Sequence, residues 1–465
     1  MKKLHRGALA IALHAATSFC ACENVLSPSH QTPVLASGWQ GQLIANGFTK
    51  PRSIHFDTAG SLIVLDSGVG VRRVRLEDKG DTCLSVTENE LLIDDTELNH
   101  GLALSADGKT LYASTVSSVH AYSYDPQAGK VSPNPRTVIS GMSNNDHTTR
   151  TLLMSRRSPG RLIVSRGSDE NFDVDALDLS SGVSQIRVFD LNKLGDGDTY
   201  DFNTQGRVLG WGLRNSVGVD EDPRSGNVYS VETSVDEITR DGVNIEENNP
   251  GEELNFHGKA DERGDVGNYG YPYCYPLWDT DVPDNEGLRV GDVFSVTQNS
   301  TFNDTTCQEE YVPPRLVFPA HTSPLGLLFS EDGETLYISF RGSFNPKNPV
   351  GYMVSSVAFS DGQPVERVSS NTALSDVMTN PDLSRCPDEC FRPVGLAWDK
   401  EGRLWVTSDS TGEIYVLKRT GAGGSGSGGG KGTFVTGSDE SRARGRGVAV
   451  GVAGAAVVLA GLIAF

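Results

Sequence analysis

The segment LLFSEDGETLYIS (327–339) decides the fold. It consists of an apolar run, a short turn containing Asp and Gly, and an alternating strand, which is the pattern of a β-hairpin. The pattern occurs five more times, as IHFDTAGSLIVLD (54–66), LALSADGKTLYAS (102–114), LLMSRRSPGRLIVS (152–165), VGVDEDPRSGNVYSVE (217–232) and LAWDKEGRLWVTS (396–408). Six copies without helical periodicity between them predict an all-β, six-bladed β-propeller of four-stranded antiparallel blades.

The six hairpins are unevenly spaced, and the largest gap lies between the fourth and fifth copies. This gap predicts an insertion at about residues 233–315, which would hold the glycosylation sequons at Asn299 and Asn303. An array of β-sandwich domains is the alternative, but it would need linkers, and no linker composition occurs before residue 420. We therefore assign residues 22–420 to a single propeller domain.

The composition excludes one class of partner. The 465 residues include 60 acidic and 40 basic side chains, which gives a net charge of -20 and a pI near 4.9. A surface this acidic repels phosphate backbones, so we expect no binding to nucleic acid. The 52 glycines are typical of a fold with many tight turns.

Both ends of the chain carry targeting patterns. Residues 1–21 are basic and then apolar, which predicts a secretory signal peptide cleaved after Ala16 or Ala21. Residues 421–437 form a Gly/Ser-rich linker, and residues 438–465 combine small residues, a polar spacer and an apolar tail. This end predicts a glycosylphosphatidylinositol signal, with a plain tail-anchored helix as the alternative. We therefore expect a secreted protein held at the cell surface by a lipid anchor.

The cysteine count agrees with secretion. One of the seven cysteines, Cys20, falls inside the predicted signal peptide and leaves six. Six cysteines in an oxidising compartment predict three disulfides. Their order in the chain suggests the pairs Cys274–Cys307, Cys386–Cys390 and Cys22–Cys83.

Polar residues in the loops beside the hairpins are candidates for a site, because loops converge on one face of a propeller. His147 follows Asp146 before the third hairpin and is a candidate general base, although a loop histidine alone is a weak signal. Arg214, with Asn215 beside it, Arg341 and Arg392 stand at the edges of other hairpins. Three such arginines on an acidic chain favour a buried anionic ligand, and surface ion pairs are the alternative.

Two further loops concentrate oxygen atoms near tight turns. NPGEELN (249–255) and NYGYP (268–272) offer the carboxylate and carbonyl ligands that Ca²⁺ prefers, with an acidic surface loop as the alternative. A third loop, PAHTSPLG (319–326), places His321 ahead of the fifth hairpin.

The order of these motifs resembles the glucose/sorbosone dehydrogenase family over about residues 22–418. The motifs are DH…R, GLRNxxG, NPGEELN with NYGYP, AHxSPLG, RGSxN and CFRPVGLA. The chain is most similar to the fungal branch of pyrroloquinoline-quinone (PQQ) dependent pyranose dehydrogenases. The resemblance implies a six-bladed propeller that binds PQQ over its channel with Ca²⁺ beside it. It also implies oxidation of a pyranose or ketoaldose, with electrons passed to an external acceptor such as a secreted haem protein.

The same resemblance implies roles for individual residues. His147 corresponds to the general base that takes the sugar hydroxyl proton, and Asp146 would orient it. The implied cofactor-binding residues are Arg214, Asn215, Arg341, Arg392 and His321. The implied metal ligands are Glu253 and the carbonyl of Tyr269 at a structural Ca²⁺ site, and the carbonyls of Thr233 and Ser234 at the Ca²⁺ beside PQQ.

The chain departs from the branch pattern in two places. Relatives read F-H-G-S-W-N-R and then G-Y-K where this chain has FRGSFNP (340–346) and then Met353, although Arg341 keeps a cation there. Asp66 and Ser67 stand where some relatives have Glu-Gln. Two other functions therefore stay open: a calcium-dependent lactonase-like hydrolase, which the arginine loops fit poorly, and a non-catalytic propeller that binds glycans or proteins at the cell surface.

Overall fold

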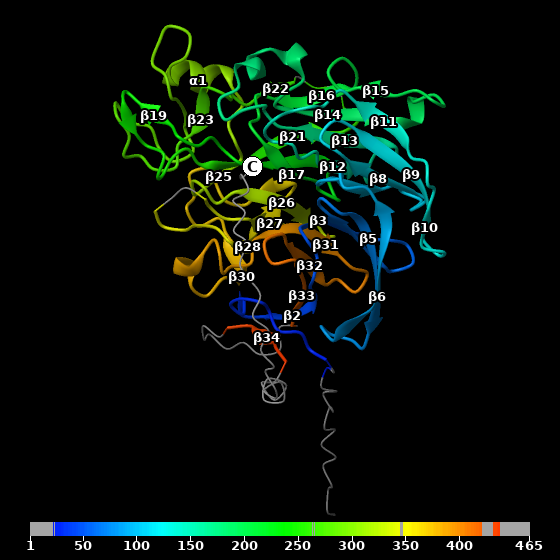
Figure 1. Cartoon of the computed structure of the whole chain (residues 1–465). Helices are drawn as coiled ribbons and strands as arrows, with labels where there is room; N and C mark the ends of the chain where they lie inside the picture. The colour runs from blue at the N-terminus through cyan, green and yellow to red at the C-terminus, as the bar shows by residue number, and fades with distance from the viewer. Residues whose placement is uncertain are drawn as a thin grey trace, which may run out of the picture.

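Six small sheets stand around a common axis in the computed structural model, which describes residues 22, 24–262, 264, 266–344, 347–420 and 431–437 (Figure 1). The innermost strands pack against one another in chain order, and the last contacts the first. These strands are β3 (Pro51–Phe56), β7 (Leu102–Leu104), β12 (Leu152–Met154), β17 (Ser216–Glu221), β26 (Pro324–Phe329) and β31 (Pro393–Trp398). The predicted six-bladed propeller is confirmed.

Each blade contains four antiparallel strands, as predicted. Beyond the inner strands, blades one to three contain β4 (Leu62–Asp66), β5 (Gly70–Asp78) and β6 (Leu84–Asp94); β8 (Thr110–Ser114), β9 (Val119–Asp125) and β11 (Arg136–Ser140); and β13 (Arg161–Arg166), β14 (Gln185–Asp190) and β16 (Arg207–Trp211). Blades four to six contain β18 (Asn227–Glu232), β21 (Glu252–Lys259) and β25 (Leu316–Phe318); β27 (Thr335–Phe340), β28 (Met353–Ser360) and β30 (Ser375–Thr379); and β32 (Leu404–Ser408), β33 (Glu413–Arg419) and β2 (Trp39–Ala45).

Short elements decorate these blades. Six extra strands extend them: β1 (Val34–Leu35), β10 (Lys130–Val131), β15 (Tyr200–Asp201), β22 (Gly267–Asn268), β29 (Gln363–Pro364) and β34 (Thr433–Val435). Two small hairpins stand apart, β19 (Thr239–Arg240) with β20 (Val243–Asn244) and β23 (Cys274–Pro276) with β24 (Val293–Ser295). The helical pieces are α1 (Asp304–Glu310), η1 (Val174–Leu177), η2 (Leu179–Ser181), η3 (Leu191–Lys193) and η4 (Leu383–Arg385).

Glycines in the inner strands let the blades approach closely around the axis. A Cβ on Gly326 would lie 2.1 Å from the carbonyl oxygen of Val394, and one on Gly395 would lie 2.1 Å from that of Arg52. No side chain larger than hydrogen fits between backbones at these separations. The inner strands therefore lie in register, with their first residues at one face of the ring.

The hydrophobic core lies between blades rather than within one centre. Tyr229 of β18, Phe329 of β26 and Phe359 of β28 meet edge to face between blades four and five, with ring centroids 5.0 to 5.7 Å apart. All three are buried. Burying each such ring contributes about 1.5–3 kcal/mol, so each interface stabilises its two blades jointly.

The ring is closed by the N-terminal strand β2, which pairs antiparallel with β33 as the fourth strand of blade six. On the other edge of β2 lies β34, in parallel register. Residues 431–437 belong to the range 421–437 that the sequence predicted as a linker, and they dock on the blade through β34. The ring of Phe434 lies 6.0 Å from that of Tyr415.

The range predicted as one insertion, 233–315, is divided by β21, which is the third strand of blade four. The extra chain therefore comprises residues 233–251 on one side of β21 and residues 260–315 on the other. The first segment carries the hairpin of β19 and β20. The second carries the hairpin of β23 and β24, together with α1 and both sequons.

All three predicted disulfides are present: Cys22–Cys83, Cys274–Cys307 and Cys386–Cys390. The predicted signal peptide (1–21) and lipid-anchor signal (438–465) lie outside the described residues. Within the ranges that the structure describes, no helix is both long and apolar enough to cross a bilayer.

Candidate active site

All six inner strands begin at one face, and the loops that precede them bring polar residues from every blade to that face. Hydrogen bonds join neighbouring blades at the same level: Ser114 Oγ donates to the Arg150 carbonyl, and Thr407 Oγ1 donates to the Arg52 carbonyl. A channel of about 540 Å³ runs along the inner strands from this end, with His100 among its lining residues. The connections between second and third strands return to the same face and complete the rim.

His147 enters this rim just before β12. Its Nδ1 lies 2.9 Å from Ser168 Oγ and 3.2 Å from the Ser168 carbonyl oxygen. Because the Ser168 hydroxyl donates to the Glu170 carbonyl, Nδ1 carries the ring proton and donates to Ser168. The lone pair therefore lies on Nε2.

The electrostatic surroundings keep His147 neutral. Burial lowers its pKa to about 4, and the positive charge of Arg214 acts in the same direction. Asp146 accepts a hydrogen bond from the His147 backbone N–H, and its other carboxylate oxygen lies 4.0 Å from Nε2. The ring orientation thus comes from Ser168, while Asp146 fixes the backbone and places a carboxylate near the free nitrogen.

Arg214 and Asn215 lie directly beside His147. A Cβ on Gly167 would lie 2.7 Å from His147 Cβ and 2.9 Å from Asn215 Oδ1, so the contact between the two loops requires glycine. The Arg214 guanidinium is buried and donates to the carbonyls of Thr233 and Ser234, at 3.3 and 2.8 Å. The carbonyls predicted to bind Ca²⁺ are therefore partners of Arg214 in this structure.

Asp236 links Arg214 to His321. Its carboxylate lies 3.6 Å from Arg214 Nη2 and 3.3 Å from His321 Nδ1. His321 Nε2 lies 2.6 Å from the Glu246 carbonyl oxygen. Burial acts to lower the His321 pKa, but Asp236 and the Glu246 carbonyl outweigh it and raise the pKa to about 9. His321 is therefore a cation at neutral pH.

A second cationic group surrounds the buried carboxylate of Asp409. Arg52 Nη1 lies 2.5 Å from Asp409 Oδ2, and Arg341 Nε lies 2.9 Å from the same oxygen. Arg52 Nε also donates to His100 Nδ1, at 3.2 Å. Burial acts to raise the Asp409 pKa, but Arg52 and Arg341 outweigh it, so the pKa is lowered and the carboxylate stays ionised. The group keeps a net positive charge.

Arg392 lies next to this group and makes no ion pair among the described residues. Its guanidinium donates to the carbonyls of Arg341 and Gly342, at 3.1 and 2.6 Å. Its carbon centre lies 3.8 Å from the ring centroid of Phe344, which is 69% exposed. Burial and the charge of Arg341 lower the Arg392 pKa to about 10. The guanidinium therefore remains charged at neutral pH.

The predicted metal residues lie beside a buried pair of carboxylates. Glu253 of β21 faces Glu232 of β18 across the two strands, and both are only 3% exposed. Burial raises the Glu253 pKa to about 8 and raises that of Glu232 as well. Asn255 Oδ1 is buried there without a hydrogen-bond partner. Burial raises the pKa of the Tyr269 hydroxyl, and the charges of Glu253 and Glu232 act in the same direction.

The structure thus gathers the predicted residues along one arc of the rim. Hydrogen bonds join the loops of this arc. Arg341 N donates to the Ser323 carbonyl. The Glu252 carboxylate accepts from the backbone N–H groups of Ser323 and Ser234. The sequence reasoning missed six residues of this arc: Arg52, His100, Ser168, Glu232, Asp236 and Asp409. Only Glu232 and Asp236 had a local signal, since they flank Thr233 and Ser234. The others contact partners that are distant in the sequence.

Comparison with known proteins decides the family. The family model described as TrAA12-like matches residues 33–420. The chain belongs to the TrAA12-like family. The expected family resemblance is confirmed, since a pyrroloquinoline quinone-dependent sugar dehydrogenase of Hypocrea jecorina (strain QM6a) is 52% identical over 404 residues, which cover 85% of this chain and 92% of that protein.

Two solved structures extend the likeness. A calcium structure of Trichoderma reesei Carbohydrate-Active Enzymes Family AA12 has 53% identity and a TM-score of 0.84, covering 85% of this chain and 99% of that one. The holo form of the pyranose dehydrogenase PQQ domain from Coprinopsis cinerea has 35% identity and a TM-score of 0.81, covering 86% and 99%. The match to the whole Coprinopsis protein spans 57% of its length.

Proposed function

We propose that this TrAA12-like protein is a sugar dehydrogenase that uses PQQ and Ca²⁺ to oxidise a pyranose or ketoaldose. One observation of the site carries the proposal: a neutral histidine, His147, with its lone pair on Nε2, shares a rim with buried arginines. One of these arginines has no carboxylate partner in the part of the chain that the structure describes. A base and an anion-binding pocket are the two elements that this reaction requires of the protein.

The arginines of the rim fit an anionic quinone. PQQ carries carboxylates, and guanidinium groups bind carboxylates through paired, charge-assisted hydrogen bonds. Arg392 is charged and buried to 4% exposure, and Arg341 keeps only one carboxylate, which it shares with Arg52. These two arginines and His321 would hold the carboxylates, and the exposed ring of Phe344 would border them.

The carboxylate pair fits Ca²⁺. Glu232 and Glu253 face each other in the interior, Asn255 Oδ1 has no partner, and the hydroxyl oxygens of Thr233 and Ser234 are also buried without partners. Ca²⁺ binds six to eight oxygens, many of them carbonyl or amide oxygens. No group of three or more His, Cys, Asp or Glu that could hold a metal occurs in the described part of the chain. Neutral oxygens would therefore supply much of the coordination.

The residues divide the chemistry among them. When bound, PQQ would supply the quinone that accepts the hydride. A Ca²⁺ beside it, expected near Thr233 and Ser234 and distinct from the structural Ca²⁺ expected at Glu253, would supply a Lewis acid that polarises the quinone. His147 Nε2 takes the proton of the sugar hydroxyl, while Ser168 holds the proton on Nδ1 and keeps the ring in place. The positive charges of Arg214 and His321 favour anionic groups on the same rim.

Reconstitution tests this proposal. The mature protein, mixed with PQQ and Ca²⁺, should show the absorbance of bound quinone, and an aldose or ketoaldose with a dye acceptor should turn over. His147→Ala should abolish turnover while PQQ occupancy stays intact. His120→Ala is the matched control, because His120 lies on the third strand of blade two. Failure of the wild-type protein to bind saturating PQQ would overturn the proposal.

We also propose that the protein works outside the cell, held at the surface by a glycosylphosphatidylinositol anchor, and passes electrons to an external acceptor such as a secreted haem protein. Three disulfides and the terminal sequence patterns support this location. Phosphatidylinositol-specific phospholipase C should release the protein from intact cells. Retention after complete phospholipase treatment would contradict the anchor.

A further inference from the structure

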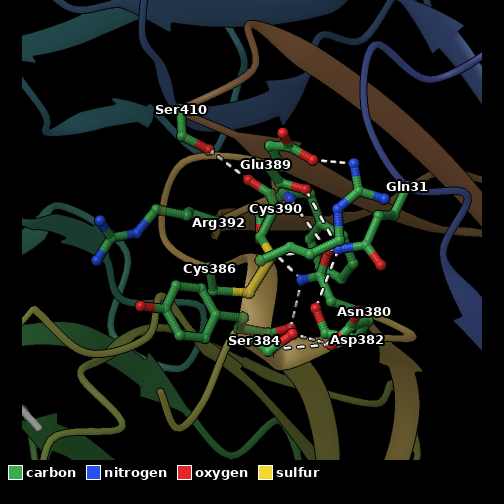
Figure 2. The surroundings of a disulfide bond; sticks show 12 residues. Gln31, Asn380, Asp382, Ser384, Cys386, Glu389, Cys390, Arg392 and Ser410 are labelled. Carbon is green, nitrogen blue, oxygen red and sulfur yellow. Dashed lines mark hydrogen bonds and ion pairs between the residues drawn. A yellow bond between two sulfur atoms is a disulfide. The ribbon is translucent and has the colours of Figure 1, made fainter. Parts of the chain in front are cut away.

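The Cys386–Cys390 disulfide lies directly behind Arg392, with the guanidinium pointing away from it (Figure 2). Cys390 is two residues before Arg392, so the disulfide holds one end of the short segment that carries the arginine. Hydrogen bonds from the end of β32 hold the same segment. Ser410 Oγ donates to the Cys390 carbonyl at 3.1 Å, and Arg392 N donates to Ser408 Oγ at 3.0 Å.

The buried side-chain amide of Asn380 links the same segment to the backbone of Tyr352. Asn380 Oδ1 accepts from Phe391 N, and Asn380 Nδ2 donates to the carbonyls of Phe391 and Tyr352 at 3.1 and 3.0 Å. The two disulfide sulfurs belong to one small buried cluster with Tyr352, which is fully buried. The disulfide therefore supports Tyr352 as well as Arg392.

Tyr352 passes this support to the loop that binds the Arg392 guanidinium. Its hydroxyl donates to the Ser343 carbonyl, and a Cβ on Gly342 would lie 2.5 Å from its ring. The guanidinium carbon lies over two rings, 5.3 Å from the centroid of Tyr352 and 3.8 Å from that of Phe344. Its hydrogen bonds go to the carbonyls of the same loop, residues 341–343. The guanidinium thus packs near a ring that the disulfide supports.

We propose that the Cys386–Cys390 disulfide is a positioning element for the anionic cofactor: through Tyr352 it holds the Arg392 guanidinium against the 341–343 loop. This inference rests on the proposed function for the identity of the ligand. Without the disulfide, residues 386–392 and Tyr352 gain freedom, and Arg392 loses its fixed direction. Binding must then order it again, which lowers affinity. The catalytic base His147 lies on another blade, so turnover of the loaded protein should be little changed.

The double variant Cys386→Ser/Cys390→Ser tests the positioning role. PQQ affinity, measured by calorimetric titration of the Ca²⁺-loaded protein, should fall roughly 10- to 100-fold, which is the range for weakening one charge-assisted contact. The kcat at saturating PQQ should stay within a few-fold of wild type. The control is Cys22→Ser/Cys83→Ser, which removes a disulfide at the turn between β5 and β6, on the opposite face. Unchanged affinity in the first variant would overturn the proposal.

Two further measurements separate positioning from general destabilisation. Tyr352→Phe keeps the ring under Arg392 and should bind PQQ more tightly than Tyr352→Ala, which removes it. Hydrogen exchange of the peptides covering residues 341–353 and 390–395 should speed up in the disulfide variant without any cofactor. If wild-type protein fails to bind PQQ, the proposed function fails, and this exchange still decides the positioning role. Unchanged exchange would refute it.

Discussion

His147 and His321 lie on the same rim and differ in charge. Burial and the charge of Arg214 lower the pKa of His147 to about 4. Burial acts on His321 in the same direction, but Asp236 and the Glu246 carbonyl raise its pKa to about 9. At neutral pH one ring therefore accepts a proton and the other carries positive charge. Two histidines of one site are suited to opposite tasks because only one has a carboxylate at hydrogen-bond distance from a ring nitrogen.

The His147 pKa predicts the acid limit of activity. A general base must be neutral, and a lowered pKa keeps it neutral as the pH falls, until the pH reaches about 4. We expect kcat/KM, measured with PQQ already bound, to decline on the acid side around pH 4. A decline centred between pH 6 and 7, the range of an ordinary histidine, would contradict this assignment.

A second prediction concerns Asp409. Asp409→Asn leaves the buried Arg52 and the partly buried Arg341 without their shared carboxylate, so the free energy of unfolding should fall by about 3–5 kcal/mol. Chemical denaturation measures this change. Glu334→Gln is the control, because the Arg224–Glu334 pair is exposed and should contribute less than about 1 kcal/mol. Equal losses in both variants would show that Asp409 is not a buried counter-charge.

At the scale of elements, the hairpins were predictable and their partners were not. Each predicted hairpin is the inner pair of strands of one blade, because the alternating pattern and turn residues are local signals. β21 went unrecognised inside the predicted insertion, since its first four residues are all buried and show no alternation. Asp409 joins Arg52 across 357 positions of the chain, and no local pattern encodes such a pairing.

A further prediction concerns the stability of the loop at residues 341–344. Gly342 has a φ of +91°, and a Cβ there would lie 2.5 Å from the Tyr352 ring. Gly342→Ala should therefore destabilise the fold by about 2–4 kcal/mol and weaken PQQ binding. Gly402 has a φ of +70°, but no atom lies within 4 Å of a Cβ added there. Gly402→Ala should therefore lower the free energy of unfolding by only about 1 kcal/mol. Thermal unfolding of both variants checks this, and equal shifts would exclude the steric contribution.

For the whole molecule, the decisive feature is a ring closed by strands from both ends of the chain. β2 lies between β33 and β34 in blade six, so the N-terminal segment completes a blade built by the C-terminal one (Figure 1). The sequence predicted six hairpins in a ring but not which end would supply the last strand. Nothing local distinguishes β2 from an outer strand of blade one, the next blade in the chain.

The closure predicts unequal effects of two truncations. A chain that ends at residue 420 loses β34 and keeps four strands in blade six, so it should stay folded with a modestly lower melting temperature. A chain that begins at residue 46 loses β2 and leaves β33 with an unpaired edge, so it should aggregate. Size-exclusion chromatography and calorimetry distinguish the outcomes. A soluble, cooperative protein without β2 would contradict the closure.

The place of β2 also affects how the chain is made. β2 leaves the ribosome before any blade, yet its partner β33 ends at Arg419, near the end of the described chain. The segment WQGQLIA therefore has to remain unpaired while five blades form, which leaves an apolar strand exposed through most of synthesis. Chaperones would be needed most during this interval, and a mutation that delays blade six would lead to aggregation even where the finished ring is stable.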